Sequence, residues 1–242
     1  MTARQSDVLV IVPVHNEALS LGAVLTELRA HAPYCDVVVV NDGSTDATPD
    51  VAHAAGVPVI DLCFNLGIGG AVQAGFKYAL ERDYRVAVQL DGDGQHLPEE
   101  IAPLIEPVRT GECEMSIGSR FINGRNDYNG SVARRLATDV LSRICGLVTG
   151  QRITDATSGF RAYGPRALRY LAAYYPADYH EPEAIVLLSR RGLAIREVPV
   201  RMRPRQGGRS SISGTRMVYY MAKVTLSLLL AAFKEGPARQ TT

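Results

Sequence analysis

The first half of the chain alternates unbroken apolar runs with segments whose apolar residues recur every three or four positions. Short apolar runs bounded by polar residues predict strands buried on both faces, and the three-to-four spacing predicts helices. We expect strands at 8–14, 37–40, 57–62, 86–90 and 115–118, with helices between them. Repeated strand–helix alternation predicts an α/β fold with a mostly parallel central sheet and helices on both faces.

Capping residues predict where the helices begin. Asn16 is the expected cap of the first helix, and Thr48 is the expected cap of the second, with Pro49 at its first position. A Gly-rich turn, Asn65–Gly75, leads into a helix predicted over Gly70–Glu81. Its amides can meet a phosphate, but its small residues also permit close packing of helix on sheet, and we favour packing.

Polar residues gather where four of the predicted strands end. They form PVHNE (13–17), NDGSTD (41–46), DGDGQH (91–96) and GSR (118–120). Sheets of this kind bind ligands at the carboxyl ends of their strands. We therefore expect these four segments to build one site.

Asp91 and Asp93 lie two residues apart directly after a strand, next to Gly92 and Gly94. Two carboxylates in such a turn can face one hard cation, and the glycines let the backbone come close. The predicted ion is Mg²⁺ or Mn²⁺, which would neutralise charge on a departing diphosphate. Gln95 and His96 could each add a ligand or position one. The alternative is an ordinary surface turn, because Asp-Gly pairs are common in turns.

Asp42 follows the second strand in the same way. A carboxylate there can accept hydrogen bonds from a base or a ribose. The alternative is an Asx-turn before a capped helix, which is our interpretation of Asp46. Glu17 also has two interpretations, a ligand-binding acid or a structural one, because an acid near the start of a helix is favourable without any ligand.

Taken together, PVHNE, VNDGSTD and DGDGQH resemble the family 2 glycosyltransferases of the Rossmann-like GT-A fold, over roughly residues 8–233. The later segments GSR, TDATSGFRAY (154–163), EVPV (197–200) and RQGGRSS (205–211) are similar to the dolichyl- and polyprenyl-phosphate sugar synthases. The resemblance implies a metal-dependent, inverting enzyme. Its donor would be a nucleoside-diphosphate sugar, and its acceptor an undecaprenyl, dolichyl or related polyprenyl phosphate.

The resemblance also implies roles for particular residues. The nucleotide sugar is expected at Pro13, His15, Glu17, Val40, Asp42, Asp91, Gly92, Asp93 and Arg120. The acceptor phosphate is expected at Arg134, Arg135, Arg161, Arg205, Arg209 and Ser211, since guanidinium groups suit phosphates. The metal is expected at Asp91, Asp93 and Gln95. The residues expected to be catalytic are Asp93, Arg120, Glu183 and Arg205. Two residues depart from the family pattern: Ser211 and Ile68 stand where a lysine is usual or frequent.

Glu183 matches the position of an acid that, in many family members, removes a proton from an acceptor hydroxyl. A phosphate acceptor is already ionised at neutral pH, because its second pKa is about 6, and it needs no base. An acid in the first turn of a helix is the other interpretation. With a phosphate acceptor, we expect Glu183 not to act as a base.

The charge is unevenly divided. Residues 196–242 carry nine Lys or Arg against two Glu, a net +7, which leaves −6 for residues 1–195. This asymmetry predicts an anionic partner for the C-terminal part, either phosphates or an anionic membrane surface. No nucleic-acid motif accompanies the charge, so no nucleic-acid partner is expected.

The C-terminal segment has the pattern of an amphipathic helix. Its polar stripe holds Arg216, Tyr220, Lys223, Ser227 and Lys234, with apolar residues elsewhere. This pattern favours a helix lying in the membrane interface, and packing on the sheet, on a second copy of the chain or on a small membrane protein is the alternative. We expect a glycosyltransferase domain at 1–211 and an interfacial helix and tail at 212–242.

The remaining features bear on location. No apolar run reaches about 18 residues, so no spanning helix is expected. The polar start predicts no secretory signal, and the four cysteines are far apart with no paired metal spacing. We therefore expect a cytoplasmic protein bound peripherally to the inner face of the membrane.

Two other functions compete with this prediction. The acceptor of the first is a sugar hydroxyl on a glycolipid, a polysaccharide or a natural product. The second is a membrane-associated adaptor that has kept the fold without turnover, since a fold does not imply activity. The presence of both Asp91 and Asp93 argues against the adaptor.

Overall fold

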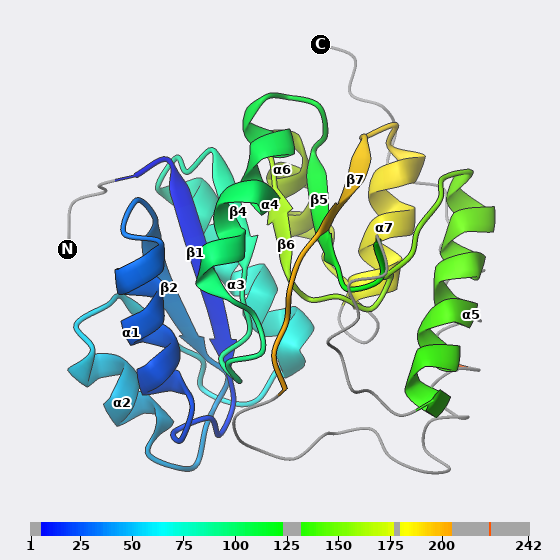
Figure 1. Ribbon diagram of the computed structural model, residues 1–242. Coiled ribbons are helices and arrows are strands. Elements are labelled where there is room, and N and C mark those ends of the chain that lie inside the picture. The colour runs from blue at the N-terminus through cyan, green and yellow to red at the C-terminus, as the bar shows by residue number, and fades with distance from the viewer. Residues whose placement is uncertain (1–5, 123–131, 177–179, 205–222, 224–242) are drawn as a thin grey trace.

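The computed structural model describes residues 6–122, 132–176, 180–204 and 223. Within them, seven strands form one sheet in the order β3-β2-β1-β4-β6-β5-β7 (Figure 1). The strands are β1 (Val8–Val14), β2 (Asp36–Asn41), β3 (Val59–Asp61), β4 (Val86–Gln89), β5 (Met115–Ser119), β6 (Arg161–Tyr163) and β7 (Ile195–Pro199).

Helices cover both faces of this sheet (Figure 1). The helices are α1 (Leu21–His31), α2 (Thr48–Ala54), α3 (Gly67–Glu81), α4 (Ile101–Arg109) after the 3-10 turn η1 (Pro98–Glu100), α5 (Val132–Thr149), α6 (Pro165–Tyr174) and α7 (His180–Arg190). Helices α1, α2 and α4 contribute to one apolar cluster, and α3, α5, α6 and α7 contribute to the other. The expected α/β architecture is therefore confirmed.

Strand β1 explains why its sequence is apolar without alternation. Val8, Val10 and Val12 pack in the cluster with α1 and α4, whereas Leu9 and Ile11 pack in the cluster with α3. Every residue of the strand is buried. A strand covered on both faces has no polar side, as the continuous run predicted.

The sheet is mostly parallel, with one reversal. Strand β1 pairs in parallel with β2 and β4, β2 with β3, and β5 with β7. Strand β6 lies antiparallel between β4 and β5, and its three residues are too few for the apolar pattern to predict it. Because β6 is antiparallel to both β4 and β5, these two strands run in the same direction. Their carboxyl ends lie at the same edge of the sheet, with Asp91 and Arg120 directly beyond them.

Three predicted helix starts are corrected. Helix α1 begins after Ser20, and Asn16 lies before it with a positive φ of 57°. Thr48 is the first residue of α2, and its hydroxyl accepts a hydrogen bond from the Glu17 amide at 2.9 Å. Helix α3 begins at Gly67, three residues before the predicted start. Polar side chains at these positions join neighbouring loops and do not cap a helix.

The expected C-terminal helix and the domain limit at residue 211 lie outside the described residues, apart from Lys223. Of the helices that the structure describes, none is long and apolar enough to cross a membrane.

Candidate active site

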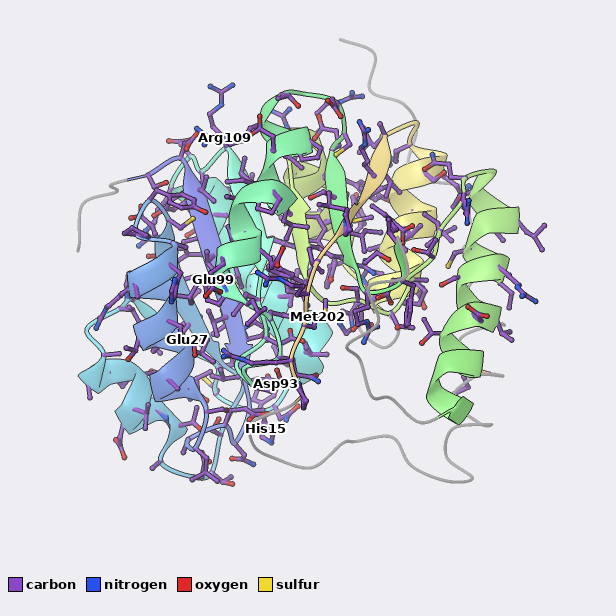
Figure 2. The ribbon with its side chains drawn as sticks, in the orientation of Figure 1. His15, Glu27, Asp93, Glu99, Arg109 and Met202 are labelled. Atoms are coloured by element: carbon purple, nitrogen blue, oxygen red, sulfur yellow. The ribbon has the colours of Figure 1, made fainter. Side chains whose placement is uncertain are left out.

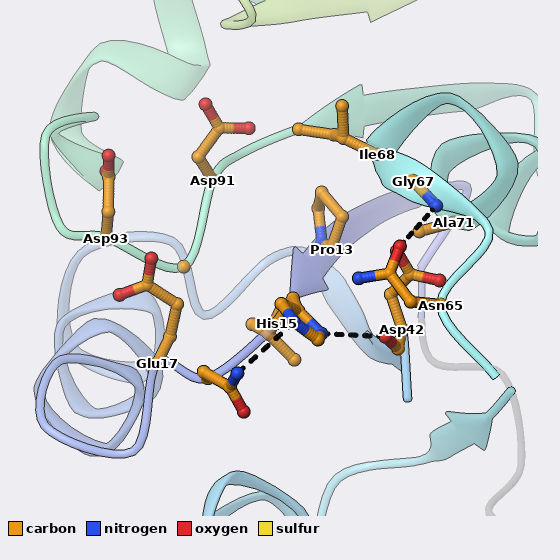
Figure 3. Close-up of a pocket in the computed structure, with 13 residues that line it drawn as sticks. Pro13, His15, Glu17, Asp42, Asn65, Gly67, Ile68, Ala71, Asp91 and Asp93 are labelled. Atoms are coloured by element: carbon orange, nitrogen blue, oxygen red, sulfur yellow. Dashed lines mark hydrogen bonds between the residues drawn. The ribbon is translucent and has the colours of Figure 1, made fainter. Parts of the chain in front are cut away.

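A cavity of about 470 Å³ lies where β1, β2 and β4 end (Figure 3). Seven of the nine predicted donor residues line it: Pro13, His15, Glu17, Asp42, Asp91, Gly92 and Asp93. They come from three segments that are far apart in the sequence, and the parallel pairing of the strands brings them together. Residues of three of the four expected segments therefore meet at this cavity, whereas no residue of GSR (118–120) lines it.

Val40 and Arg120 do not line this cavity. The placement of Val40 at the donor is corrected, because its side chain is fully buried in the apolar cluster with α3. In β2, Val38 and Val40 share that cluster while Val39 packs in the other, so the alternation of the strand fixes where Val40 points.

Hydrogen bonds fix Asp42 and His15 at one end of the cavity (Figure 3). His15 Nδ1 lies 2.8 Å from the Asp42 carbonyl oxygen, and a carbonyl only accepts, so Nδ1 carries the proton. In the neutral ring Nε2 is then an acceptor, and Asn16 Nδ2 lies 3.2 Å from it. The Asp42 carboxylate accepts a 2.7 Å hydrogen bond from the Leu66 amide. These contacts fix the orientation of the Asp42 carboxylate in the cavity wall.

Asp46 behaves as the turn residue that we expected. Its Oδ1 accepts a hydrogen bond from the Thr48 amide at 2.9 Å, and its Oδ2 accepts one from the Ala18 amide at 3.3 Å. The Asp46 carboxylate thus ties the loop after β1 to the start of α2, and these hydrogen bonds lower its pKa against the opposing effect of burial.

The Gly-rich turn contributes residues that the sequence interpretation did not assign to the site. Asn65, Gly67, Ile68 and Ala71 line the cavity, and Asn65 Oδ1 accepts a hydrogen bond from the Gly67 amide at 2.8 Å. Asn65 follows the third strand, so the strand-end rule could have found it. The favoured packing role is confirmed at Gly75, where a Cβ would lie 2.4 Å from Ile11 Cγ2.

Asp91 and Asp93 form the other end of the cavity, in a loop that depends on its glycines (Figure 3). A Cβ at Gly92 would lie 2.5 Å from Val14 Cγ1, so only glycine lets the loop cross the end of β1. A Cβ at Gly159 would lie 3.1 Å from Asp91 Oδ2. The space around the carboxylate is therefore kept open by a second glycine, from a distant segment.

Gln95, the third predicted metal ligand, does not line the cavity. Its backbone amide donates a 3.0 Å hydrogen bond to Asp93 Oδ1. This contact orients the Asp93 carboxylate from behind, and ligation by the Gln95 side chain stays a prediction.

His96 supports the same loop as a neutral group. Its Nδ1 accepts a 3.1 Å hydrogen bond from the Asp91 amide, and its ring stacks on Phe160 with centroids 4.9 Å apart. Burial lowers the pKa of His96 to about 4, against the opposing influence of Asp93. At neutral pH the proton is therefore on Nε2, which lies 4.0 Å from Asp91 Oδ2.

The chemistry of this pair fits a hard divalent cation. Within the described residues, no three His, Cys, Asp or Glu side chains gather as a metal site. Mg²⁺ needs no such cage, because it is usually bound by one or two carboxylates together with substrate phosphates and water. Asp91 and Asp93 supply two carboxylates on one cavity wall, and the cavity leaves room for phosphates.

Arg120 is held at the same sheet edge by a buried carboxylate. Its Nε and one terminal nitrogen each donate to an oxygen of Asp155 at 2.7 Å, and Asp155 is fully buried. Glu197 in turn accepts from the amides of Thr154 and Asp155 at 2.9 and 2.8 Å. The sequence interpretation did not assign this support, because the three charged residues lie far apart in the chain.

The assignment of Arg161 to the acceptor phosphate is wrong. Arg161 lies in β6 with a fully buried side chain. Its guanidinium donates to the carbonyl oxygens of Ser158, Glu181 and Ala156 at 2.7, 2.7 and 3.0 Å. These bonds close the turn before β6 onto the start of α7, so this arginine serves the fold.

The remaining predicted residues divide in two. Glu183 lies half-buried in the first turn of α7 and does not line the cavity. Outside the described residues or side chains lie Arg134, Arg135, Arg205, Arg209 and Ser211. Their roles stay predictions.

The chain matches the model of glycosyl transferase family 2 over residues 9–171, more than half of its length. It belongs to this family, and it is a glycosyltransferase. The undecaprenyl-phosphate mannosyltransferase of Micrococcus luteus is 37% identical over 215 residues, which cover 86% of this chain and 88% of that protein. The polyprenol monophosphomannose synthase of Mycolicibacterium smegmatis is 31% identical over 225 residues, covering 89% and 84%. The chain thus falls in the polyprenyl-phosphate sugar synthase branch of its family.

The fold is also found among solved structures. Glucosyl-3-phosphoglycerate synthase from Mycobacterium tuberculosis, in complex with Mn²⁺, uridine diphosphate and phosphoglyceric acid, matches with a TM-score of 0.70. The match covers 96% of this chain and 80% of that chain at 20% identity. This similarity confirms the GT-A fold.

Proposed function

We propose that this glycosyltransferase moves a sugar from a nucleoside-diphosphate sugar to a polyprenyl phosphate, with inversion and with Mg²⁺ or Mn²⁺ as cofactor. The observation that carries the proposal is the shape of the site. One cavity holds an oriented Asp42 at one end and the pair Asp91 and Asp93 at the other. A nucleoside diphosphate has matching ends, with a hydrogen-bonding ribose and base joined to an anionic diphosphate.

The two ends of the donor molecule, its nucleoside and its diphosphate, are bound by different groups of the protein. Asp42 accepts hydrogen bonds from the nucleoside, and His15, whose tautomer is fixed by the Asp42 carbonyl, forms the neighbouring wall. Asp91 and Asp93 hold the cation, which when bound neutralises charge on the departing diphosphate. The solved relative that holds Mn²⁺ together with uridine diphosphate supports this arrangement.

The acceptor is proposed from the named relatives, an undecaprenyl-phosphate mannosyltransferase and a polyprenol monophosphomannose synthase. An ionised phosphate oxygen attacks the anomeric carbon as the bond to the diphosphate breaks, so the new bond forms on the opposite face of the sugar. The nucleophile is already deprotonated, and no residue needs to remove a proton. The acceptor phosphate is assigned to Arg205 and the cations near it.

A lipid acceptor places the protein at a membrane. The basic segment 196–242 and the amphipathic pattern of 216–234 support peripheral binding at the cytoplasmic face. Truncation after Ser213 is expected to move the protein from the membrane fraction to the soluble fraction.

The test is a transfer assay with a panel of nucleotide sugars, Mn²⁺ or Mg²⁺, and polyprenyl phosphate, followed by extraction of sugar-lipid into organic solvent. Excess chelator and Asp93→Asn should each abolish transfer while the melting temperature stays similar. Asp83→Asn is the matched control, since Asp83 is exposed and its φ of 57° suits asparagine equally. Full activity in excess chelator, or transfer only to sugar hydroxyls, would overturn the proposal.

A further inference from the structure

The chain that follows β7 returns to the loop that carries Asp91 and Asp93. Met202 pairs with His96 as an antiparallel bridge, and the Arg203 amide donates to the Gln95 carbonyl oxygen at 3.0 Å. Figure 2 shows this segment descending past Met202 toward Asp93. Val200 and Met202 are buried, so the segment is part of the folded body.

Arg203 ties this loop to a third element. Its Nε donates a 2.6 Å hydrogen bond to the carbonyl oxygen of Gly94, the residue directly after Asp93. A terminal nitrogen of the same guanidinium forms an ion pair with Glu27 on α1. One side chain thus links the cation loop, the N-terminal half of the sheet through α1, and the chain after β7.

The conformation of Gly94 gives this contact its importance. Gly94 has a φ of 76°, a backbone conformation that residues other than glycine rarely adopt. This conformation sets the orientation of the peptide unit between Gly94 and Gln95. Both ends of this peptide unit are held. Its Gly94 carbonyl oxygen accepts from Arg203, and its Gln95 amide donates to Asp93 Oδ1. Fixing the Gly94–Gln95 peptide therefore fixes the Asp93 carboxylate.

The ion pair with Glu27 offsets the positive charge that Arg203 places near the cation site. A guanidinium beside a cation site would repel the cation if it were uncompensated. Glu27 pairs with a terminal nitrogen of the guanidinium, away from the Nε that holds Gly94, and offsets its charge, so the loop gains a strong donor with little net positive charge.

We propose that Arg203 is a positioning residue for the cation site, acting through the Gly94–Gln95 peptide, with Glu27 as its counter-ion. This inference rests on the proposed metal-dependent transfer.

The test measures Mn²⁺ binding directly, by titration calorimetry and by the Mn²⁺ paramagnetic resonance signal, in the presence of uridine diphosphate and separately of guanosine diphosphate. Arg203→Gln is expected to weaken Mn²⁺ binding about tenfold, since it removes a charge-assisted hydrogen bond and its ion pair. Arg203→Lys keeps the positive charge but replaces two separate donor nitrogens by one, so a loss of about threefold is expected. Glu27→Gln leaves the guanidinium charge uncompensated and should also weaken binding.

Arg201→Gln is the matched control. Arg201 lies on the same segment, mostly exposed, and its Nε donates to Glu100 at 2.7 Å, away from the cation loop. Its Mn²⁺ affinity should stay within about twofold of wild type. The melting temperature of each variant without metal shows whether the fold is intact.

The outcomes separate the two proposals. If the wild type neither binds Mn²⁺ with a nucleotide nor transfers sugar, the proposed function fails. If the wild type binds Mn²⁺ and Arg203→Gln and Arg203→Lys bind it equally well or more tightly, then the positioning role is overturned. Weakened binding in Arg203→Gln, partial recovery in Arg203→Lys and unchanged binding in Arg201→Gln would support it.

Discussion

Replacing Glu197 with Ala tests whether the network behind Arg120 holds that arginine in place. Glu197 accepts from the Thr154 amide and hydroxyl, each at 2.9 Å, and from the Asp155 amide at 2.8 Å. After truncation, the Thr154 hydroxyl can turn to Ser119 Oγ, which lies 2.7 Å away. The two amides are then left without their acceptor.

The magnitude follows from those two groups. A buried amide without an acceptor costs about 1–3 kcal/mol, and Glu197 is half-buried, so water partly replaces the carboxylate. We expect Glu197→Ala to lower the free energy of unfolding by about 2–4 kcal/mol. Glu112→Ala is the control: it removes an exposed ion pair with Arg196 at the same strand and should cost less than about 1 kcal/mol.

The functional effect follows from Asp155, whose amide Glu197 holds and whose carboxylate holds Arg120. A loosened Asp155 misplaces the guanidinium, and kcat is expected to fall by about 10- to 100-fold. Urea unfolding followed by circular dichroism, together with initial rates of sugar-lipid formation, measures both effects. If Glu197→Ala unfolds like the wild type and keeps its rate, the amides have found other acceptors and the network does not position Arg120.

Three further predictions concern Gly159, Glu181 and the pair Glu183 and Arg205. Gly159→Ala should raise the Mn²⁺ concentration needed for half-maximal activity about tenfold by crowding the Asp91 carboxylate, as a metal titration of activity would show. Burial acts to raise the pKa of Glu181, but His180 and Arg161 lower it to about 2. The ionised Glu181 therefore contributes to the free energy of unfolding above pH 4.5, and this contribution is lost as the pH falls toward 2. In acid unfolding followed at several pH values, Glu181→Gln should reduce that loss by up to about 3 kcal/mol. Glu183→Gln should change kcat by less than about threefold, while Arg205→Ala raises the apparent KM of polyprenyl phosphate; a loss of about 10³ in Glu183→Gln kinetics would instead indicate a hydroxyl acceptor.

The cavity could be predicted because its main residues follow a local rule. Asp42, Asp91 and Asp93 each come within three residues of the end of an apolar run, and the strand-end rule depends only on such runs. Pairing between distant segments has no local signal. Asp155 and Glu197 are separate acids in the sequence. The β5–β7 pairing brings Glu197 beside Ile117, and the Asp155 amide, in the loop before β6, donates to Glu197.

Residue type alone misleads where burial decides the role. An arginine in a glycosyltransferase motif suggests a phosphate, but Arg161 points inward and satisfies three carbonyl oxygens. The structure of β6 explains this, because a strand covered on both faces leaves that side chain no route to solvent. The apolar pattern does not predict β6, so it gave no warning of the burial.

The order of the strands has a consequence for how the enzyme becomes active during folding. The β1–β2 pairing joins residues close in sequence, whereas the β5–β7 pairing joins Met115 to Ile195. Contacts of long sequence separation form later, because they must close a larger loop of chain. During synthesis the nucleoside end of the cavity can therefore assemble while the Arg120 support is still unmade. A chain that ends before β7 would lack Glu197, and with it the acceptor that holds the Asp155 amide behind Arg120.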